Sequence, residues 1–121
     1  MRQIKFKAKR LDNGEWVEGL PILYKVDGSY MWRECREPVR IDPNTLCQFT
    51  GLKDKDGKEI WEHDIVEAPL DKAEIVYNEK YACFDYIYPD GSRCAIVAEI
   101  EGELKVIGNK FDKEEKVTIQ R

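Results

Sequence analysis

The stretch Thr50–Val66 reads TGLKDKDGKEIWEHDIV, and its acids suit either an ion site or a tight turn. Which of the two it forms decides how this part of the chain folds. The acids are Asp54, Asp56, Glu59, Glu62 and Asp64. Aligned as an EF-hand loop with Gly57 at the sixth position, the stretch puts Leu52 at the first ligand position and His63 at the twelfth. Two ligands are then missing, the bidentate one among them. The pair Asp56-Gly57 is instead typical of hairpin turns, whose central residues need positive φ. The stretch therefore predicts a turn that feeds a strand.

Further turn dipeptides divide the rest of the chain into short segments. They are Asn13-Gly14, Asp27-Gly28, Asp90-Gly91 and Glu101-Gly102. Apolar residues with a period of two follow between them, within residues 4–8, 20–26, 75–77, 84–88 and 94–100. A period of two places each row on one face of a sheet. The sequence thus predicts a mainly β fold built from antiparallel hairpins.

Helix signals are confined to two places. Asp42 suits an N-cap with Pro43 at the first helical position, and the stretch FDKEEKV at residues 111–117 has the composition for one turn. We expect one or two short helical turns there. A seam around residues 42–51 divides the chain into an N-terminal β-hairpin region, residues 1–48, and a second β region, residues 49–121, within one compact unit.

Composition and charge limit the classes of function. The 121 residues are 42% hydrophobic and 11% aromatic, which is too apolar for a disordered chain. Residues 1–60 carry 12 Lys and Arg against 10 Asp and Glu, whereas residues 61–121 carry 8 against 14. Bulk charge therefore does not favour nucleic-acid binding. No apolar run approaches the roughly 18 residues of a membrane helix, and no signal-peptide core follows the N-terminus. We expect a cytoplasmic protein that does not contact membranes.

The residues that could hold a metal or do chemistry are few. The cysteines Cys35, Cys47, Cys83 and Cys94 lack the close spacing of zinc sites, and without an export signal we expect them to be reduced thiols. His63 is the only histidine, and its neighbour Asp64 would point to the opposite face of a strand. We expect no catalytic residues, no metal and no cofactor. A small hydrolase-type enzyme centred on His63, with Asp64 or a thiol, is the weakest alternative.

The N-terminal stretch is basic, with no acid before Asp12. Its charged residues are Arg2, Lys5, Lys7, Lys9 and Arg10. The three lysines share one face of a predicted strand about 6.6–7 Å apart, a spacing compatible with contacts to phosphates. The same pattern suits the polar face of an edge strand, where lysines discourage aggregation. Both interpretations stay open.

Three stretches together resemble the YopX-like family of phage and prophage proteins. They are MRQIKFKAKRLDNGEWVEG at residues 1–19, VRIDPNTLCQFTGLKDKDGKEIWEHDIVE at residues 39–67 and LKVIGN at residues 104–109. The motif residues, to which we assign a structural role, are Thr50, Gly51, Leu52, Asp56, Gly57, Ile60, Asp64, Ile65 and Val66. The family usually has glycine directly before Asp-Ile-Val, where this chain has His63. If that glycine serves a positive φ, His63 has to adopt one.

The resemblance implies a mainly β protein with an SH3-type barrel in its later part, residues 49–121. It also implies a protein encoded by a phage or prophage that works in the cytoplasm of a bacterial host. The family carries no established activity, so no catalytic role transfers to this chain.

The function that these observations favour is a non-enzymatic accessory module that binds another protein or itself as a homo-oligomer. Four aromatic residues suit either the core or a surface that faces a partner: Trp16, Tyr24, Tyr30 and Trp32. The alternative is a nucleic-acid-binding small β-barrel that uses the basic N-terminal strand, since aromatic faces of barrels can stack on bases.

Overall fold

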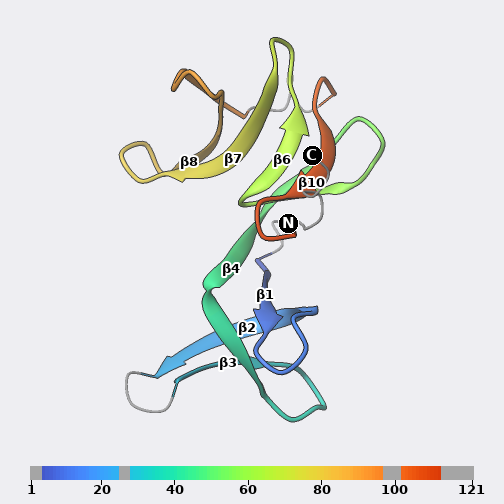
Figure 1. Ribbon diagram of the computed structural model, residues 1–121, viewed down its shortest axis with the longest axis vertical. Helices are drawn as coiled ribbons and strands as arrows, with labels where there is room; N and C mark the ends of the chain where they lie inside the picture. The colour runs from blue at the N-terminus through green and yellow to red at the C-terminus, as the bar shows by residue number, and fades with distance from the viewer. Residues whose placement is uncertain (1–3, 25–27, 97–101, 113–121) are drawn as a thin grey trace, which may run out of the picture. The chain divides into compact units, whose positions relative to one another are not determined.

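The computed structural model describes residues 4–24, 28–96 and 102–112, which contain strands and no helix (Figure 1). The strands are β1 (Phe6–Arg10), β2 (Trp16–Tyr24), β3 (Gly28–Trp32), β4 (Val39–Lys53), β5 (Glu59–Trp61), β6 (Asp64–Glu67), β7 (Lys72–Asn78), β8 (Cys83–Ile87), β9 (Arg93–Ala95) and β10 (Lys105–Asn109). All the strand pairs with a recorded register are antiparallel. Turns follow β1 at Asn13-Gly14, β4 at Asp56-Gly57 and β8 at Asp90-Gly91. The predicted fold class, a mainly β protein of antiparallel hairpins, is confirmed.

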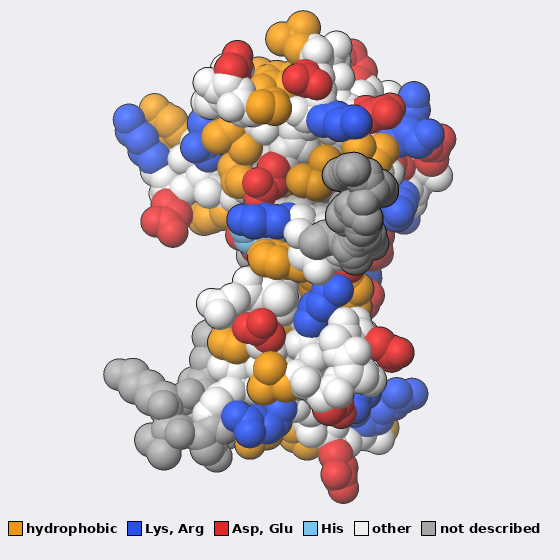
Figure 2. Space-filling view, in the orientation of Figure 1, with side chains coloured by type: hydrophobic (Ala, Val, Ile, Leu, Met, Phe, Trp, Pro, Cys, Tyr) orange, Lys and Arg blue, Asp and Glu red, His pale blue; other side chains and the backbone are white. Residues whose placement is uncertain are grey.

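The chain divides into two compact units, Met1–Phe49 and Thr50–Arg121. Strand β4 contributes residues to both, because it runs through the boundary. On the face in view, basic and acidic side chains are interspersed in each unit, without a large area of one sign (Figure 2). The positive balance of the N-terminal part is therefore not concentrated on that face.

The first unit is a small closed ring of strands. Strand β1 pairs with β2 on one side and with β4 on the other, and β3 joins β2 to β4. Its core consists of Ala8, Val17, Met31 and Ile41, one residue from each strand. The interpretation of β1 as an edge strand is wrong, because both of its edges carry ladder hydrogen bonds.

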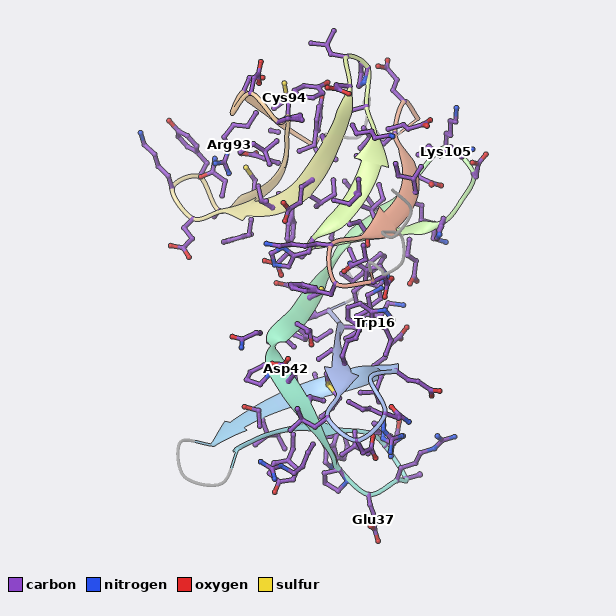
Figure 3. All side chains as sticks on the ribbon, in the orientation of Figure 1. Trp16, Glu37, Asp42, Arg93, Cys94 and Lys105 are labelled. Carbon is purple, nitrogen blue, oxygen red and sulfur yellow. The ribbon has the colours of Figure 1, made fainter. Side chains whose placement is uncertain are left out.

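The helical turn predicted after Asp42 is absent, and residues 39–53 are a bulged strand (Figure 3 labels Asp42). Between Lys9↔Asp42 and Lys7↔Cys47 the ladder with β1 skips several residues of β4. There the Asp42 carboxylate accepts a hydrogen bond from the Asn44 N–H (3.0 Å), and Thr45 Oγ1 accepts one from the Lys9 N–H (2.8 Å). A side chain that suits an N-cap equally suits such a local turn, and pairing with β1 decides between them. Of the second predicted turn, residues 113–117 lie outside the described residues.

The second unit holds a five-stranded sheet in the order β10-β6-β7-β8-β9. The larger core cluster of the protein lies in this unit and consists of Ile60, Val66, Ala73, Ile75, Tyr86, Tyr88, Ile96, Leu104 and Val106. Within the described residues no ladder joins the outer strands β9 and β10, so the predicted SH3-type barrel is not confirmed. Ring closure occurs in the first unit instead.

Gly19 is a position where this packing requires glycine. A Cβ atom there would overlap the backbone oxygen of Trp32 on β3 and stand 2.9 Å from the Met31 Cγ. We expect Gly19→Ala to destabilise the protein by about 1–3 kcal/mol, because backbone cannot move aside as a flexible side chain can. Urea unfolding followed by tryptophan fluorescence measures this.

Gly102→Ala is the matched control for that measurement. A Cβ atom on Gly102 has nothing within 4 Å, so its change in the free energy of unfolding stays within about 0.5 kcal/mol. Equal stability of the two variants would contradict the close approach of β2 and β3.

Candidate functional site

Asp54, in the stretch Thr50–Val66, is a buried acid held by backbone groups. Its Oδ1 accepts hydrogen bonds from the N–H groups of Asp56 and Lys58, each at 2.9 Å. Its Oδ2 accepts one from the Val106 N–H, also at 2.9 Å. Burial raises the pKa of Asp54, but these three donors together lower it more, so the net pKa lies below the usual value. The carboxylate is therefore a structural anion whose oxygens are already occupied.

The same turn covers the outer edge of β10. The Lys55 N–H donates to the Leu104 oxygen at 3.0 Å, next to the bond from the Val106 N–H to Asp54. Leu104 and Val106 point these groups away from β6, because alternate residues of a strand bond to the same side. An exposed strand edge invites pairing with another chain, so this cover discourages association through β10.

A second buried acid, Asp64, holds the turn between β5 and β6. Its Oδ2 accepts the Trp61 N–H at 2.8 Å, and its Oδ1 accepts the Asn109 amide at 2.9 Å. Asp64 is only 3% exposed. Within the described residues, no group of three or more His, Cys, Asp or Glu side chains is placed to hold a metal ion.

The remaining motif residues shape the backbone or fill the core. Thr50 Oγ1 donates to the Ile60 oxygen at 2.7 Å and accepts the Leu52 N–H at 3.2 Å. Gly51 and Gly57 have φ of 90° and 84°, the left-handed conformation that favours glycine. The side chains of Ile60 and Val66 are fully buried, whereas Ile65 is half-buried on the other face of the sheet.

His63 adopts φ of 71°, the conformation that glycine would take at this position. Its Nδ1 lies 3.0 Å from Glu74 Oε2, and its Nε2 lies 3.8 Å from Glu62 Oε2. The ring packs edge-on against Phe111 at 5.2 Å between centroids. Lys110 Nζ approaches the same Glu74 oxygen at 3.9 Å.

Glu74, and not Asp64, is therefore the partner of His63, since Asp64 is engaged by Trp61 and Asn109. Sequence analysis missed Glu74 and Phe111 because only the tertiary fold brings them to His63. Among the described residues, both ring nitrogens face carboxylates and neither faces a hydroxyl or thiol. Such a cluster can hold the ring in place, but it does not present the nucleophile that a hydrolase of this kind needs. No disulfide joins the described cysteines.

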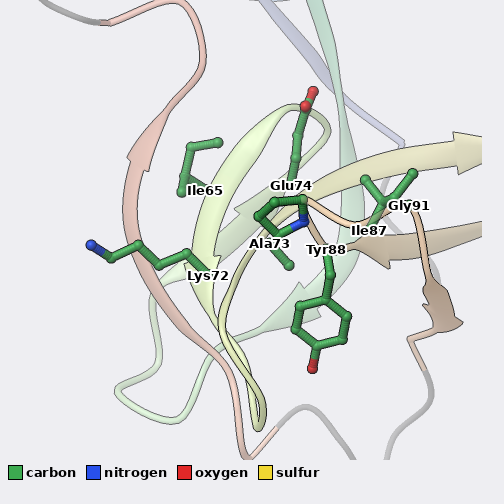
Figure 4. Close-up of a pocket in the computed structure, with 8 residues that line it drawn as sticks. Ile65, Lys72, Ala73, Glu74, Ile87, Tyr88 and Gly91 are labelled. Atoms are coloured by element: carbon green, nitrogen blue, oxygen red, sulfur yellow. The ribbon is translucent and has the colours of Figure 1, made fainter.

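An open groove of about 360 Å³ lies beside Glu74 (Figure 4). Its lining consists of Ile65, Lys72, Ala73, Glu74, Ile87, Tyr88, Pro89 and Gly91. The Tyr88 hydroxyl accepts the Leu70 N–H at 3.2 Å, and the Glu74 carboxylate contacts His63 and Lys110. These two polar groups therefore already have partners within the protein.

The predicted basic residues lie on or next to β1, apart from Arg2, which is outside the described residues. Lys7 Nζ and Lys9 Nζ lie 4.5 and 5.1 Å from the centroid of the same Trp16 ring. Lys5 Nζ lies 4.9 Å from the centroid of Phe49. Arg10 is paired with Asp12 through two hydrogen bonds of 3.0 and 2.8 Å. The structure thus combines the lysines with aromatic rings and neutralises the arginine.

These lysines belong to a larger surface, the outer face of β1, β2 and β3. Ala8 pairs with Val17 and faces the core, so the alternate residues Lys7, Lys9, Trp16 and Glu18 face outward. Leu20 continues this outward row on β2 and lies opposite Trp32 on β3. The outer face is therefore basic, aromatic and aliphatic together.

A groove of about 390 Å³ is hollowed into one end of this face, and we call it the first-unit groove. It is lined by Ile4, Lys5, Glu18, Gly19, Leu20, Trp32, Arg33 and Glu34. The apolar side chains are well exposed, Ile4 by 58%, Leu20 by 49% and Trp32 by 44%. Alternation alone did not reveal this, because it groups residues by face without saying which face is covered. Of the predicted aromatic group, Trp32 is exposed and Trp16 and Tyr30 are half-buried, while the side chain of Tyr24 lies outside the description.

The chain matches the model of a known protein family. The family described as YopX protein matches residues 5–117. Curated protein sequences include none that matches the chain. Within the described ranges there is no helix of the length and apolarity that crossing a membrane requires.

Replacing Asp54 tests its structural role. We expect Asp54→Asn to lower the free energy of unfolding at pH 7 by about 1.5–3 kcal/mol, because the charged acceptor of three buried N–H groups is lost. A carboxylate whose pKa is lower in the folded state stabilises the fold at pH values above its unfolded-state pKa of about 3.9. This stabilisation is lost as the pH falls through the folded-state pKa. The difference in the free energy of unfolding between wild type and Asp54→Asn should therefore be largest at pH 6–7 and disappear in acid.

Chemical denaturation between pH 2.5 and 7 measures this difference. Asp56→Asn is the control, since Asp56 is exposed and only its backbone N–H bonds to Asp54. A gap that stays constant across this pH range would show that the Asp54 charge is not what holds the turn.

Proposed function

This chain belongs to the YopX family, and from that premise we infer that it is a phage- or prophage-encoded accessory protein that acts by binding protein. In this proposal it works without catalysis, in the cytoplasm of a bacterial host. The first-unit groove is the docking surface.

One observation carries the proposal: Leu20 and Trp32 lie opposite each other on neighbouring strands and are both almost half exposed. Ile4 adds a third exposed apolar side chain to the same hollow. Grouped apolar exposure with a charged rim is typical of interaction sites, and tryptophan is among the residues most often found at their energetic centres.

The contacts of the other candidate sites support a binding role rather than a chemical one. The oxygens of Asp54 and Asp64 accept hydrogen bonds from N–H groups, which gives both acids a structural task. The partners of His63 are carboxylates from Glu62 and Glu74. An activated nucleophile next to a base is the usual mark of a hydrolase, and these partners do not supply it.

Capture of partners by variants of the groove tests the proposal. Tagged wild-type protein is incubated with a nuclease-treated lysate of host cells that also produce the untagged chain, and the retained proteins are identified by mass spectrometry. We expect Trp32→Ser to lose the retained protein, because truncating a central aromatic anchor commonly costs 2 kcal/mol or more, about 30-fold in affinity.

Leu70→Ser is the matched control, since Leu70 is 84% exposed and lies in the other unit. It should retain the same protein as the wild type. If Trp32→Ser keeps its partner while remaining folded, the groove is not the docking surface.

A second candidate function, binding of single-stranded nucleic acid, has one specific observation in its favour. Lys7 Nζ and Lys9 Nζ both lie close to the Trp16 ring on the outward face of β1 and β2, 4.5 and 5.1 Å from its centroid. Lysines next to an aromatic ring suit a backbone that carries phosphates and bases that stack. Glu18 on the same face opposes this, since it would repel phosphates.

Fluorescence anisotropy with a labelled oligonucleotide at 20–200 mM salt tests this function. If it holds, affinity falls steeply with salt, and Lys7→Ala with Lys9→Ala lowers the slope of log K against log salt by about 1–2. Lys72→Ala, a change in the other unit, should leave the slope unaltered. Absence of binding at the lowest salt would end this alternative.

A further inference from the structure

The charges around the first-unit groove are balanced. Two of its lining residues are basic, Lys5 and Arg33, and two are acidic, Glu18 and Glu34. A groove that takes a strongly acidic or basic partner would carry an excess of the opposite sign. This rim instead holds equal numbers of both, so it complements a surface with the same composition as itself.

We propose that the occupant of the first-unit groove is a second copy of this chain, which forms a dimer with two-fold symmetry. The proposal rests on the proposed function, because it names the partner of that surface. In a two-fold contact the same patch is used on both sides, and residue i of one copy meets residue j of the other while j meets i. Lys5 and Arg33 of each copy can then face Glu18 and Glu34 of its partner.

The apolar residues fit the same geometry. Leu20 and Trp32 lie opposite each other on β2 and β3 and line the hollow together. A volume of about 390 Å³ lies in the range of about 300–1,000 Å³ that holds bound groups, so it has room for a large side chain. Trp32 of each copy can therefore enter the hollow of the other.

Strand pairing does not offer the first unit an alternative route to association. Strand β1 is bonded on both sides, because it lies between β2 and β4 in the ring. The outer edge of β10 in the second unit is covered by Asp54 and Lys55. Contact through side chains, as in the first-unit groove, needs neither a free edge of β1 nor a free edge of β10.

Charge reversal on the full-length chain tests the dimer, with sedimentation velocity from 1 to 500 μM as the measurement. The wild type should associate reversibly. A basic variant, Glu18→Lys with Glu34→Lys, and an acidic variant, Lys5→Glu with Arg33→Glu, should each associate about 100-fold more weakly or not at all, because like charges then face each other. An equimolar mixture of the two variants should form a dimer again, since opposite charges are restored across the contact.

Two controls keep the test specific. Glu79→Lys with Glu103→Lys changes the net charge as the basic variant does, but at exposed positions of the second unit, and should associate like the wild type. Trp32→Ser should associate more weakly than Leu70→Ser at equal concentration, which probes the apolar part without altering charge.

The outcomes separate this inference from the proposed function. A wild type that stays monomeric to 500 μM, or single charge variants that dimerise as well as the wild type, would overturn the dimer. So would a mixture of folded variants that fails to associate. If the wild type is monomeric while lysate capture still depends on Trp32, the groove binds a different protein and the proposed function stands.

Discussion

The second unit depends on one buried carboxylate and the backbone groups that it satisfies. Asp54 accepts hydrogen bonds from Asp56 and Lys58 within its own turn and from Val106, far along the chain. A buried anion is tolerated only where donors surround it, so the turn and the start of β10 have to stay together. The three bonds join a local turn to a strand that lies about fifty residues further along the chain. A stretch rich in charged residues can therefore be central to the fold.

The two units protect the edges of their sheets in different ways. The first unit closes into a ring, so its strands have partners and its outer side-chain face is what it offers to other molecules. The second unit keeps an open strand order and covers the edge of β10 with the turn at residues 54–58. The groove of the first unit exposes apolar side chains, Leu20 and Trp32 above all, and this is the surface that we propose as the point of contact.

Local chemistry was readable from the residues, whereas exposure was not. Asp56-Gly57 predicted its turn because few residues tolerate positive φ, and the substitution at His63 pointed to a residue held in that conformation, which its φ of 71° matches. The helical turn predicted from Asp42-Pro43 is absent, because an aspartate side chain can accept a hydrogen bond from a nearby N–H in a bulged strand as well as in a helix. Leu20, which the alternation placed on one face of a strand, lies on the outer face and is 49% exposed.

Sequence alone determined that this chain is antiparallel β and where several of its turns fall, because alternation and glycine dipeptides act over a few bonds. It also carried the family, through the stretch around Thr50–Val66. Only the tertiary structure decided which unit closes into a ring, that Glu74 partners His63, and that Trp32 is exposed. Each of these depends on contacts between residues distant in the chain, whose free energy has no counterpart in any short segment.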